Sequence, residues 1–175
     1  KPALSALWPN KKGMSVVLDL GANIECSPKN LIDFSIMGSS LFKSLYPDDP
    51  AKVALLNIGS EEFKGNEIIK ETYQQLNQRD NHDFEFNGYI EGNQLMNGDV
   101  NVIVADGFTG NIALKTAEGT ANFITSELKK AMTGSIIGKI SSLLNISNLK
   151  KFKARLDPRL YNGAIFIGLD HPVIK

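Results

Sequence analysis

The segment Asn101–Lys115, NVIVADGFTGNIALK, decides the fold of this 175-residue chain. It opens with four consecutive apolar residues, Val102–Ala105, which predict a short strand buried on both faces. Asp106–Asn111 then form a turn that contains two glycines, and the spacing predicts a helix from Ile112. A strand followed by a glycine turn and a helix N-terminus directs backbone N–H groups towards an anion. The segment therefore predicts an α/β fold with an anion site at this turn.

Two upstream segments repeat this order of strand, glycine loop and polar side chains. Val16–Leu18 leads into Asp19–Asn23, and Val53–Leu56 leads into a loop, Asn57–Asn66, that contains Lys64. Open parallel sheets bind ligands outside the carboxyl ends of their strands. We therefore expect the three loops to gather at one edge of the sheet and to form the active site there.

Apolar spacing and helix start signals predict the other elements. The expected strands and helices alternate, which favours parallel βαβ units with right-handed crossovers. The expected fold class is therefore three-layer α/β/α with a mainly parallel sheet. The further expected elements are the end of a helix at 2–8, helices at 28–45 and 67–77, strands at 15–18, 53–58, 84–86 and 164–167, and another segment that begins at 172–175.

Residues 120–157 are expected to form a helical hairpin within a single α/β domain that spans residues 1–175. Two long helices joined by a bend at 133–135 fit the apolar spacing, and Asp157 ends the second helix. Residues 128–156 include seven basic side chains and no acidic one, although the whole chain carries 19 of each. A membrane or dimer contact is expected from five apolar side chains of this region: Ile136, Ile137, Ile140, Leu143 and Leu144.

The composition argues against several classes of protein. Nineteen basic and nineteen acidic residues cancel, so no excess charge indicates a nucleic-acid partner. No run of about eighteen apolar residues that would span a membrane occurs. The single cysteine, Cys26, cannot form an intramolecular disulfide, which fits the reducing cytoplasm. One cysteine and two distant histidines give no zinc spacing, and we expect no metal.

The common nucleotide and hydrolase motifs are absent from the sequence. There is no G-x-G-x-x-G, no G-x-x-x-x-G-K-[ST] and no G-x-S-x-G, so dinucleotide, P-loop and serine-hydrolase sites are not indicated. Strand-end carboxylates such as Asp19 and Asp106 could bind magnesium, but such groups more often cap turns. What remains is a set of cationic and amide side chains that suits inorganic phosphate: Asn23, Lys64, Asn66, Thr109 and Asn111.

Four sequence blocks indicate a protein family: LDLGAN at 18–23, LLNIGSEEFKGNE at 55–67, VADGFTGNIALKTAEG at 104–119 and YNGAIFIGLDHPVIK at 161–175. In order and spacing they resemble the bacterial acyl-ACP:phosphate acyltransferase family. The resemblance covers nearly the whole chain and the later half of the family's usual length. It implies a fold similar to that of isopropylmalate dehydrogenase and phosphotransacetylase, without a nicotinamide cofactor.

The resemblance implies transfer of a fatty acyl group from acyl carrier protein to inorganic phosphate, which gives acyl-phosphate for phospholipid synthesis. The family's proposed catalytic lysine and asparagine fall on Lys64 and Asn111, and no cofactor is implied. Phosphate and substrate are expected to contact other polar and glycine residues of the same blocks: Asn23, Gly65, Asn66, Asp106, Gly107, Thr109 and Gly110.

The resemblance also implies a cytoplasmic homodimer that touches an anionic membrane peripherally, next to a downstream glycerol-phosphate acyltransferase. For the basic region three interpretations stay open: a hairpin packed on its own domain, a dimer contact, or a tip that touches lipid. Its lysines also suit an acidic acyl carrier protein.

Two other functions are kept as alternatives. One is a phosphotransacetylase-like enzyme that uses acyl-CoA, and the other is a non-enzymatic dimerising scaffold at the membrane surface. Cys26 and His171 are weaker catalytic candidates. No histidine lies near Cys26 in the sequence to activate its thiol as an acyl acceptor.

Overall fold

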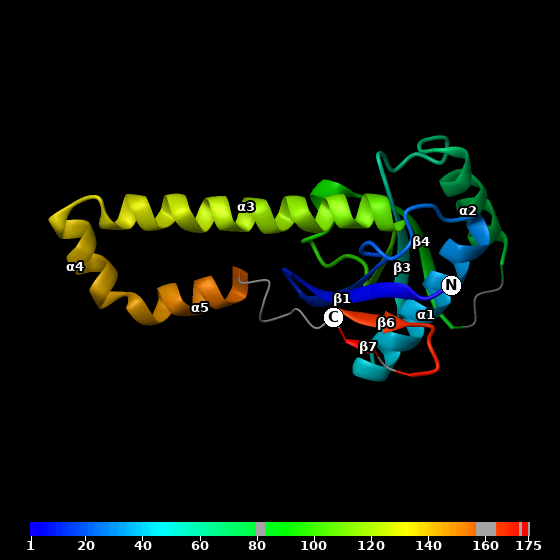
Figure 1. Ribbon diagram of the computed structural model, residues 1–175, viewed down its shortest axis with the longest axis horizontal. Helices are drawn as coiled ribbons and strands as arrows, with labels where there is room; N and C mark the ends of the chain where they lie inside the picture. Colours follow the sequence, from blue (N-terminus) through cyan, green and yellow to red (C-terminus); the bar gives the residue numbers. More distant parts are fainter. Residues whose placement is uncertain (80–82, 157–163, 172, 175) are drawn as a thin grey trace. The chain divides into compact units, whose positions relative to one another are not determined.

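The computed structural model describes residues 1–79, 83–156, 164–171 and 173–174, and the chain divides into two compact units (Figure 1). The first unit consists of Lys1–Ala113 with Gly163–Lys175, and the second consists of Leu114–Asn162. The first unit contains the sheet, and the second contains helices. The expected single domain with a hairpin at residues 120–157 stays a prediction.

The first unit is built on one mixed sheet of seven strands in the order β4-β3-β5-β2-β1-β6-β7. The adjacent strands β4, β3, β5 and β2 run parallel, whereas β1, β6 and β7 pair antiparallel. The α/β class is confirmed, and the parallel part carries the three predicted loops. The strand bounds are β1 Ala3–Asn10, β2 Gly13–Leu18, β3 Lys52–Asn57, β4 Glu85–Glu91, β5 Val102–Val104, β6 Ile165–Ile167 and β7 Val173–Ile174.

The helix end expected at residues 2–8 is wrong, because this segment is strand β1. It forms an antiparallel hairpin with β2, in which Asn10 pairs with Gly13 across a two-residue turn. The Lys12 N–H donates to Asn10 Oδ1 (2.8 Å), and this local bond stabilises the turn. Ala3 and Leu4 point to opposite faces of the sheet and are both buried, so their spacing does not distinguish a strand from a helix.

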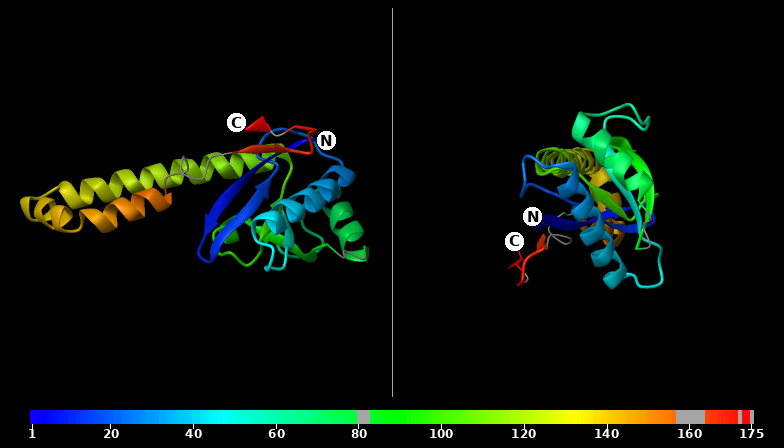
Figure 2. Two further views of the ribbon diagram at one scale, coloured as in Figure 1. Left: turned by 90° about the horizontal axis from the view of Figure 1, so that it is seen from below. Right: turned by 90° about the vertical axis from the view of Figure 1, so that its right-hand side faces the viewer.

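Two helices cover one face of the sheet, α1 Pro28–Leu45 and α2 Glu67–Gln78 (Figure 2). Both begin where the sequence predicts. Ser27 caps α1 by accepting the Asn30 N–H, and Asn66 caps α2 by accepting the Ile69 N–H (2.9 Å). Gly38 lets α1 approach the sheet, since a Cβ there would lie 2.6 Å from Val102 Cγ1. These helices form one of the helical layers that the sequence predicts.

The second unit contains most of α3 Gly107–Thr133, with α4 Ile136–Leu144 and α5 Ile146–Leu156. The predicted break after Thr133 is confirmed, but the second long helix is divided at Asn145. The predicted helix end at Asp157 lies outside the described residues. Among the helices that the structure describes, none is both long and apolar enough to cross a membrane.

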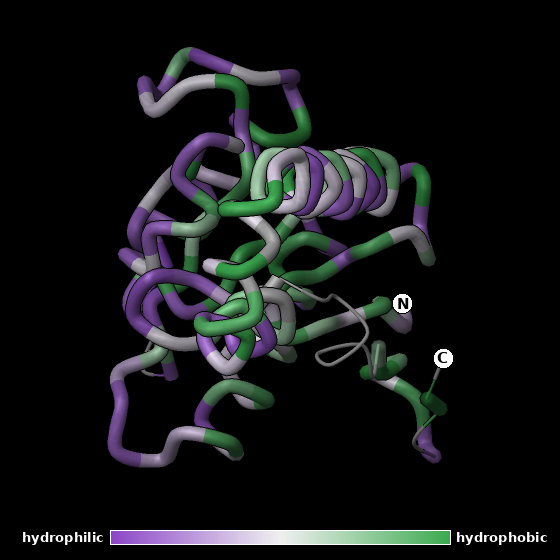
Figure 3. Tube along the Cα trace, turned by 90° about the vertical axis from the view of Figure 1, so that its left-hand side faces the viewer, coloured by the Kyte–Doolittle hydropathy of each residue, from purple (hydrophilic) through white to green (hydrophobic). Residues whose placement is uncertain are grey.

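Five of the nine residues of α4 are isoleucine or leucine (green in Figure 3). Ile136 and Ile137 each expose 78% of their surface, and Leu144 exposes 85%. Ile140 and Leu143 are also exposed. The five apolar residues predicted to form a contact surface are therefore all accessible on the chain.

Candidate active site at the carboxyl edge of the sheet

The three predicted loops leave neighbouring strands at the same edge of the sheet. β5 lies between β2 and β3, and all three strands run parallel. Val17, Ile103 and Ala54 lie side by side in this part of the sheet. The loops that follow Leu18, Val104 and Asn57 therefore begin next to one another, as the sequence predicts.

Asp19 organises the first loop from a fully buried position. Its carboxylate accepts the backbone N–H groups of Gly21 (3.2 Å), Ala22 (3.0 Å) and Asn23 (2.7 Å). It also accepts the N–H of Leu4 in β1 (3.0 Å). These bonds satisfy the buried charge within the protein. Asp19 therefore caps a turn, which is the commoner of the two roles that the sequence suggests.

Helix α3 begins earlier than expected, at Gly107 instead of Ile112. Asp106 caps it, since its carboxylate accepts the Thr109 N–H (2.7 Å) and the Thr109 hydroxyl (2.9 Å). The residues DGFTGN therefore form the cap and first turn of the helix and not a separate turn. Part of the helix N-terminus that suits an anion is thus already bound by the chain's own carboxylate.

The Asp19–Asn23 loop packs tightly against this first turn of α3. The Gly107 N–H donates to the Asn23 carbonyl (2.7 Å), and a Cβ on Gly107 would lie 2.7 Å from the same oxygen. A Cβ on Gly110 would collide with the Asp19 carbonyl. The two glycines of the motif are therefore required for close packing between this loop and the first turn of α3.

Asn111 lies where the Asp19–Asn23 loop meets the start of α3. Its side chain passes close to Gly21, where an added Cβ would lie 3.6 Å from Asn111 Cγ. Asn111 is exposed, and no hydrogen bond among the described residues uses its side-chain amide. The amide is therefore available to a ligand at the sheet edge.

Asn23 lies in the same group, but its side chain is occupied. Its Nδ2 group donates both to the Asp19 carboxylate (2.8 Å) and to the Pro2 carbonyl (2.7 Å). An asparagine amide carries two hydrogens, so neither is left for phosphate. Asn23 therefore holds the loop, and any contact with substrate would have to come from its Oδ1 atom.

Lys64 lies in a second group of residues, which follows β3. Its ammonium lies 5.5 Å from the centre of the Phe63 ring, and no carboxylate of the described residues is within ion-pair distance. Gly65 follows with φ +97°, a conformation that favours glycine. Asn66 is occupied in capping α2 through its Oδ1 atom. Lys64 is thus the free cationic group of this loop.

The predicted site residues lie in two groups, which follow neighbouring strands at one edge of the sheet. The first contains Asn23, Asp106, Gly107, Thr109, Gly110 and Asn111, and the second contains Lys64, Gly65 and Asn66. None of the hydrogen bonds among the described residues joins the two groups. The catalytic roles of Lys64 and Asn111 stay predictions.

Asn57 is a residue that the sequence analysis does not single out. Its side-chain amide donates to the carbonyl oxygens of Gly59 (3.2 Å) and Lys64 (3.1 Å). The sequence feature that could have identified Asn57 is its position: it ends the apolar run of β3, directly before the loop that contains Lys64.

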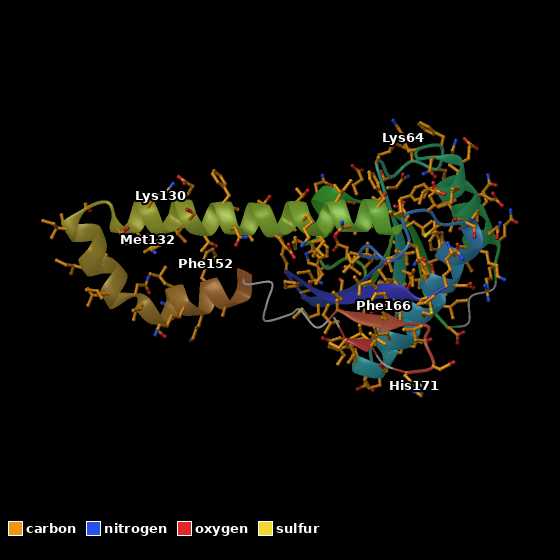
Figure 4. The ribbon with its side chains drawn as sticks, in the orientation of Figure 1. Lys64, Lys130, Met132, Phe152, Phe166 and His171 are labelled. Atoms are coloured by element: carbon orange, nitrogen blue, oxygen red, sulfur yellow. The ribbon has the colours of Figure 1, made fainter. Side chains whose placement is uncertain are left out.

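Cys26 and His171 are poorly placed for catalysis. Cys26 is buried, and its thiol points to the Asn23 carbonyl at 3.7 Å. Burial raises the pKa of the Cys26 thiol, and the carboxylates of Asp19 and Asp106 raise it further. His171 is exposed in the segment between β6 and β7, on the opposite side of the first unit from Lys64 (Figure 4). In the parts of the chain that the structure describes, no three His, Cys, Asp or Glu residues cluster as metal ligands would.

The sequence is similar to those of known phosphate acyltransferases. A phosphate acyltransferase from Pelagibacter ubique is 94% identical over 175 residues, which are all of this chain and 53% of that protein. A phosphate acyltransferase from Rhodospirillum rubrum is 46% identical over all of this chain and 50% of its own length. The chain thus spans about half the length of the curated relatives it matches.

Two solved structures with a similar fold are phosphotransacetylases. The EutD phosphotransacetylase from Staphylococcus aureus superimposes with a TM-score of 0.52 at 17% identity, over 70% of this chain and 43% of that one. A phosphotransacetylase from Streptococcus pyogenes gives 0.51 at 17% identity, over 69% of this chain and 42% of that one. At this identity the likeness concerns the fold alone. The family model described as fatty acid synthesis protein matches residues 1–175, and the chain belongs to that family.

Proposed function

We propose that this chain forms part of an enzyme that transfers a fatty acyl group from acyl carrier protein to inorganic phosphate, giving acyl-phosphate for phospholipid synthesis. The observation that carries the proposal is the packing of the Asp19–Asn23 loop on the first turn of α3. This packing leaves the Asn111 amide free at the edge from which the Lys64 loop also emerges. The names of the relatives support acyl transfer to phosphate.

In the proposed reaction Lys64 binds the phosphate dianion. Inorganic phosphate is already a nucleophile near neutral pH, so the site has to position it and partly remove its water. Lys64 suits this task because its ammonium is a compact charge without an ion-pair partner among the described residues. A phosphate oxygen then attacks the thioester carbonyl carbon.

Asn111 acts on the carbonyl oxygen in this proposal. Attack produces a tetrahedral oxyanion, which the Asn111 amide or nearby N–H groups stabilise. One such donor is worth about 3 kcal/mol in the transition state. The oxyanion collapses, the C–S bond breaks, and the thiolate leaves and takes a proton from water. No covalent enzyme intermediate is needed, which fits the burial of Cys26.

The test uses the full-length relative that is 94% identical over this chain. Replacing the equivalents of Lys64 or Asn111 by alanine should each lower phosphate-dependent thiol release from acyl-acyl carrier protein at least about a hundredfold. Near-normal turnover in both variants would contradict the assignment. The same assay with acyl-CoA as donor separates the phosphotransacetylase-like alternative, and a non-enzymatic scaffold predicts no phosphate-dependent release.

The exposed face of α4 supports a second part of the proposal, contact with another surface. Ile136, Ile137 and Leu144 are too exposed to stabilise the folded chain, so their burial has to come from a partner. We favour a symmetric contact with a second copy, and contact with anionic lipid comes second. Neighbouring Lys150 and Lys151 are suited to lipid headgroups or to an acidic acyl carrier protein. The enzyme would then work in the cytoplasm beside the membrane, next to the glycerol-phosphate acyltransferase that consumes its product.

A further inference from the structure

Asn57 holds both ends of the segment that carries Lys64. It is the last residue of β3 and is half-buried. Its Nδ2 group donates one hydrogen bond to the Gly59 carbonyl (3.2 Å) and another to the Lys64 carbonyl (3.1 Å). Both hydrogens of the amide are therefore used, and they close the six-residue segment 59–64 into a loop anchored on the sheet.

The residues around Asn57 are adapted to this contact. Gly65 has φ +97°, and a Cβ there would lie 2.6 Å from Asn57 Oδ1. A larger residue at 65 would therefore displace the asparagine. Within the loop the Lys64 N–H donates to the Glu61 carbonyl (2.9 Å). The backbone of Lys64 is thus fixed at its N–H and at its carbonyl, while its ammonium has no ion-pair partner among the described residues.

We propose that Asn57 is a positioning residue for Lys64 in the reaction. By fixing the backbone of Lys64, the Asn57 amide restricts where the ammonium can reach and directs it to the edge where phosphate is to bind. A lysine on an untethered loop would lose more conformational entropy on binding the anion. This inference rests on the proposed function, because it assumes that Lys64 binds phosphate.

A second contact with the same loop provides a matched control. The Tyr73 hydroxyl donates to Glu62 Oε1 (2.8 Å), which links the loop to α2 through two side chains at the surface. This bond does not involve the loop backbone. Tyr73→Phe therefore removes a hydrogen bond of the loop but leaves Lys64 fixed by Asn57.

The experiment compares Asn57→Leu with Tyr73→Phe, made at the equivalent positions of the full-length relative. Leucine has nearly the shape of asparagine and no donor. We expect Asn57→Leu to raise the KM for phosphate about tenfold and to leave the KM for the acyl thioester within about twofold. Hydrogen exchange of the backbone amides at 59–65 should accelerate about tenfold in the same variant. Tyr73→Phe should change neither quantity more than about twofold.

An unchanged phosphate KM in Asn57→Leu overturns the inference, and so does an equal rise in both KM values. If Asn57→Leu does not fold, Asn57→Asp is the second variant. Aspartate keeps the shape of the side chain but turns a carboxylate towards the two carbonyls. Hydrogen exchange of the backbone amides at 59–65 has to accelerate in this variant as well. Lys64→Ala separates the two proposals. If Lys64→Ala leaves the phosphate KM unchanged, the proposed function fails; if it raises that KM and Asn57→Leu does not, only the role of Asn57 fails.

Discussion

At the scale of single residues, Asp19 is the side chain on which the first loop of the site depends. It is fully buried and accepts hydrogen bonds from four backbone N–H groups, those of Leu4, Gly21, Ala22 and Asn23. Removal of the carboxylate would leave these donors without their acceptor, and the Leu4 N–H among them is buried. The fold of the loop therefore depends on Asp19.

We predict that Asp19→Ala lowers the free energy of unfolding by roughly 3 kcal/mol. Urea denaturation followed by circular dichroism measures this loss. The control is Asp99→Ala, which removes an exposed carboxylate paired with Lys12 (2.6 Å) and should leave the urea midpoint nearly unchanged. Equal midpoints for the two variants would contradict the structural role of Asp19.

Cys26 gives a prediction about pH. Burial first, and then Asp19 and Asp106, hold the pKa of its thiol above the ordinary value of 9.0. The neutral thiol is favoured, so the reactive thiolate becomes the major form only at a pH above that value. Iodoacetamide should label native Cys26 with a pH midpoint above 9.0, and urea should speed labelling strongly. Because Cys26 is the single cysteine of the chain, mass spectrometry measures it directly. Rapid labelling of the native protein at neutral pH would contradict this prediction and would support Cys26 as an acyl acceptor.

Single residues of the site could be predicted from the sequence only in part. Lys64 and Asn111 were expected to be free for a ligand, and both side chains are free of hydrogen bonds and ion pairs to other described residues. The internal use of the Asn23 amide could not be predicted, because an asparagine that binds phosphate and one that holds a loop are the same residue type. Only coordinates show which partner each amide or carboxylate has.

At the scale of elements, the start of α3 depends on close packing at two glycines. A Cβ on Gly107 would lie 2.7 Å from the Asn23 carbonyl, whereas a Cβ on Gly119 in the same helix meets no atom within 4 Å. We predict that Gly107→Ala destabilises the protein by roughly 2 kcal/mol and that Gly119→Ala stabilises the helix by up to about 1 kcal/mol. Thermal denaturation of both variants checks the difference in sign. Stabilisation by Gly107→Ala would show that the loop does not need this close contact.

Elements that have strong local signals were predicted well. Ser27-Pro28 and Asn66 start helices α1 and α2, since a cap is a property of a few neighbouring residues. Strand β1 was mistaken for a helix end, because residues on both of its faces are buried and its partner β6 is distant in the sequence. The start of α3 was placed five residues late, because glycines at 107 and 110 indicate a turn unless the packing partner at Asp19–Asn23 is known.

At the scale of the whole molecule, we expect the exposed apolar residues of α4 to contact a partner. We predict that Ile136→Asp combined with Ile137→Asp abolishes dimer formation in light scattering after size-exclusion chromatography. Flotation with anionic liposomes tests the lipid contact with the same double variant. Ile174→Asp, which changes another exposed isoleucine in β7, is the control and should behave like the parent in both assays. If the double variant dimerises and binds liposomes like the parent protein, both the dimer contact and the lipid contact are contradicted.

The order of strands in the sheet could not be predicted from the sequence. Apolar runs predict the strands themselves, but the neighbours β5 and β2 are separated by more than eighty residues. The expectation that three loops meet at one edge rested on the general behaviour of parallel sheets, and the strand order agrees with it.

The most direct test of the proposed phosphate site is a crystal structure of the full-length relative grown with inorganic phosphate. We predict one tetrahedral anion within about 3 Å of both the ammonium equivalent to Lys64 and the side-chain amide equivalent to Asn111. Phosphate bound to neither residue, or an ammonium that points away from the first turn of α3, would contradict it.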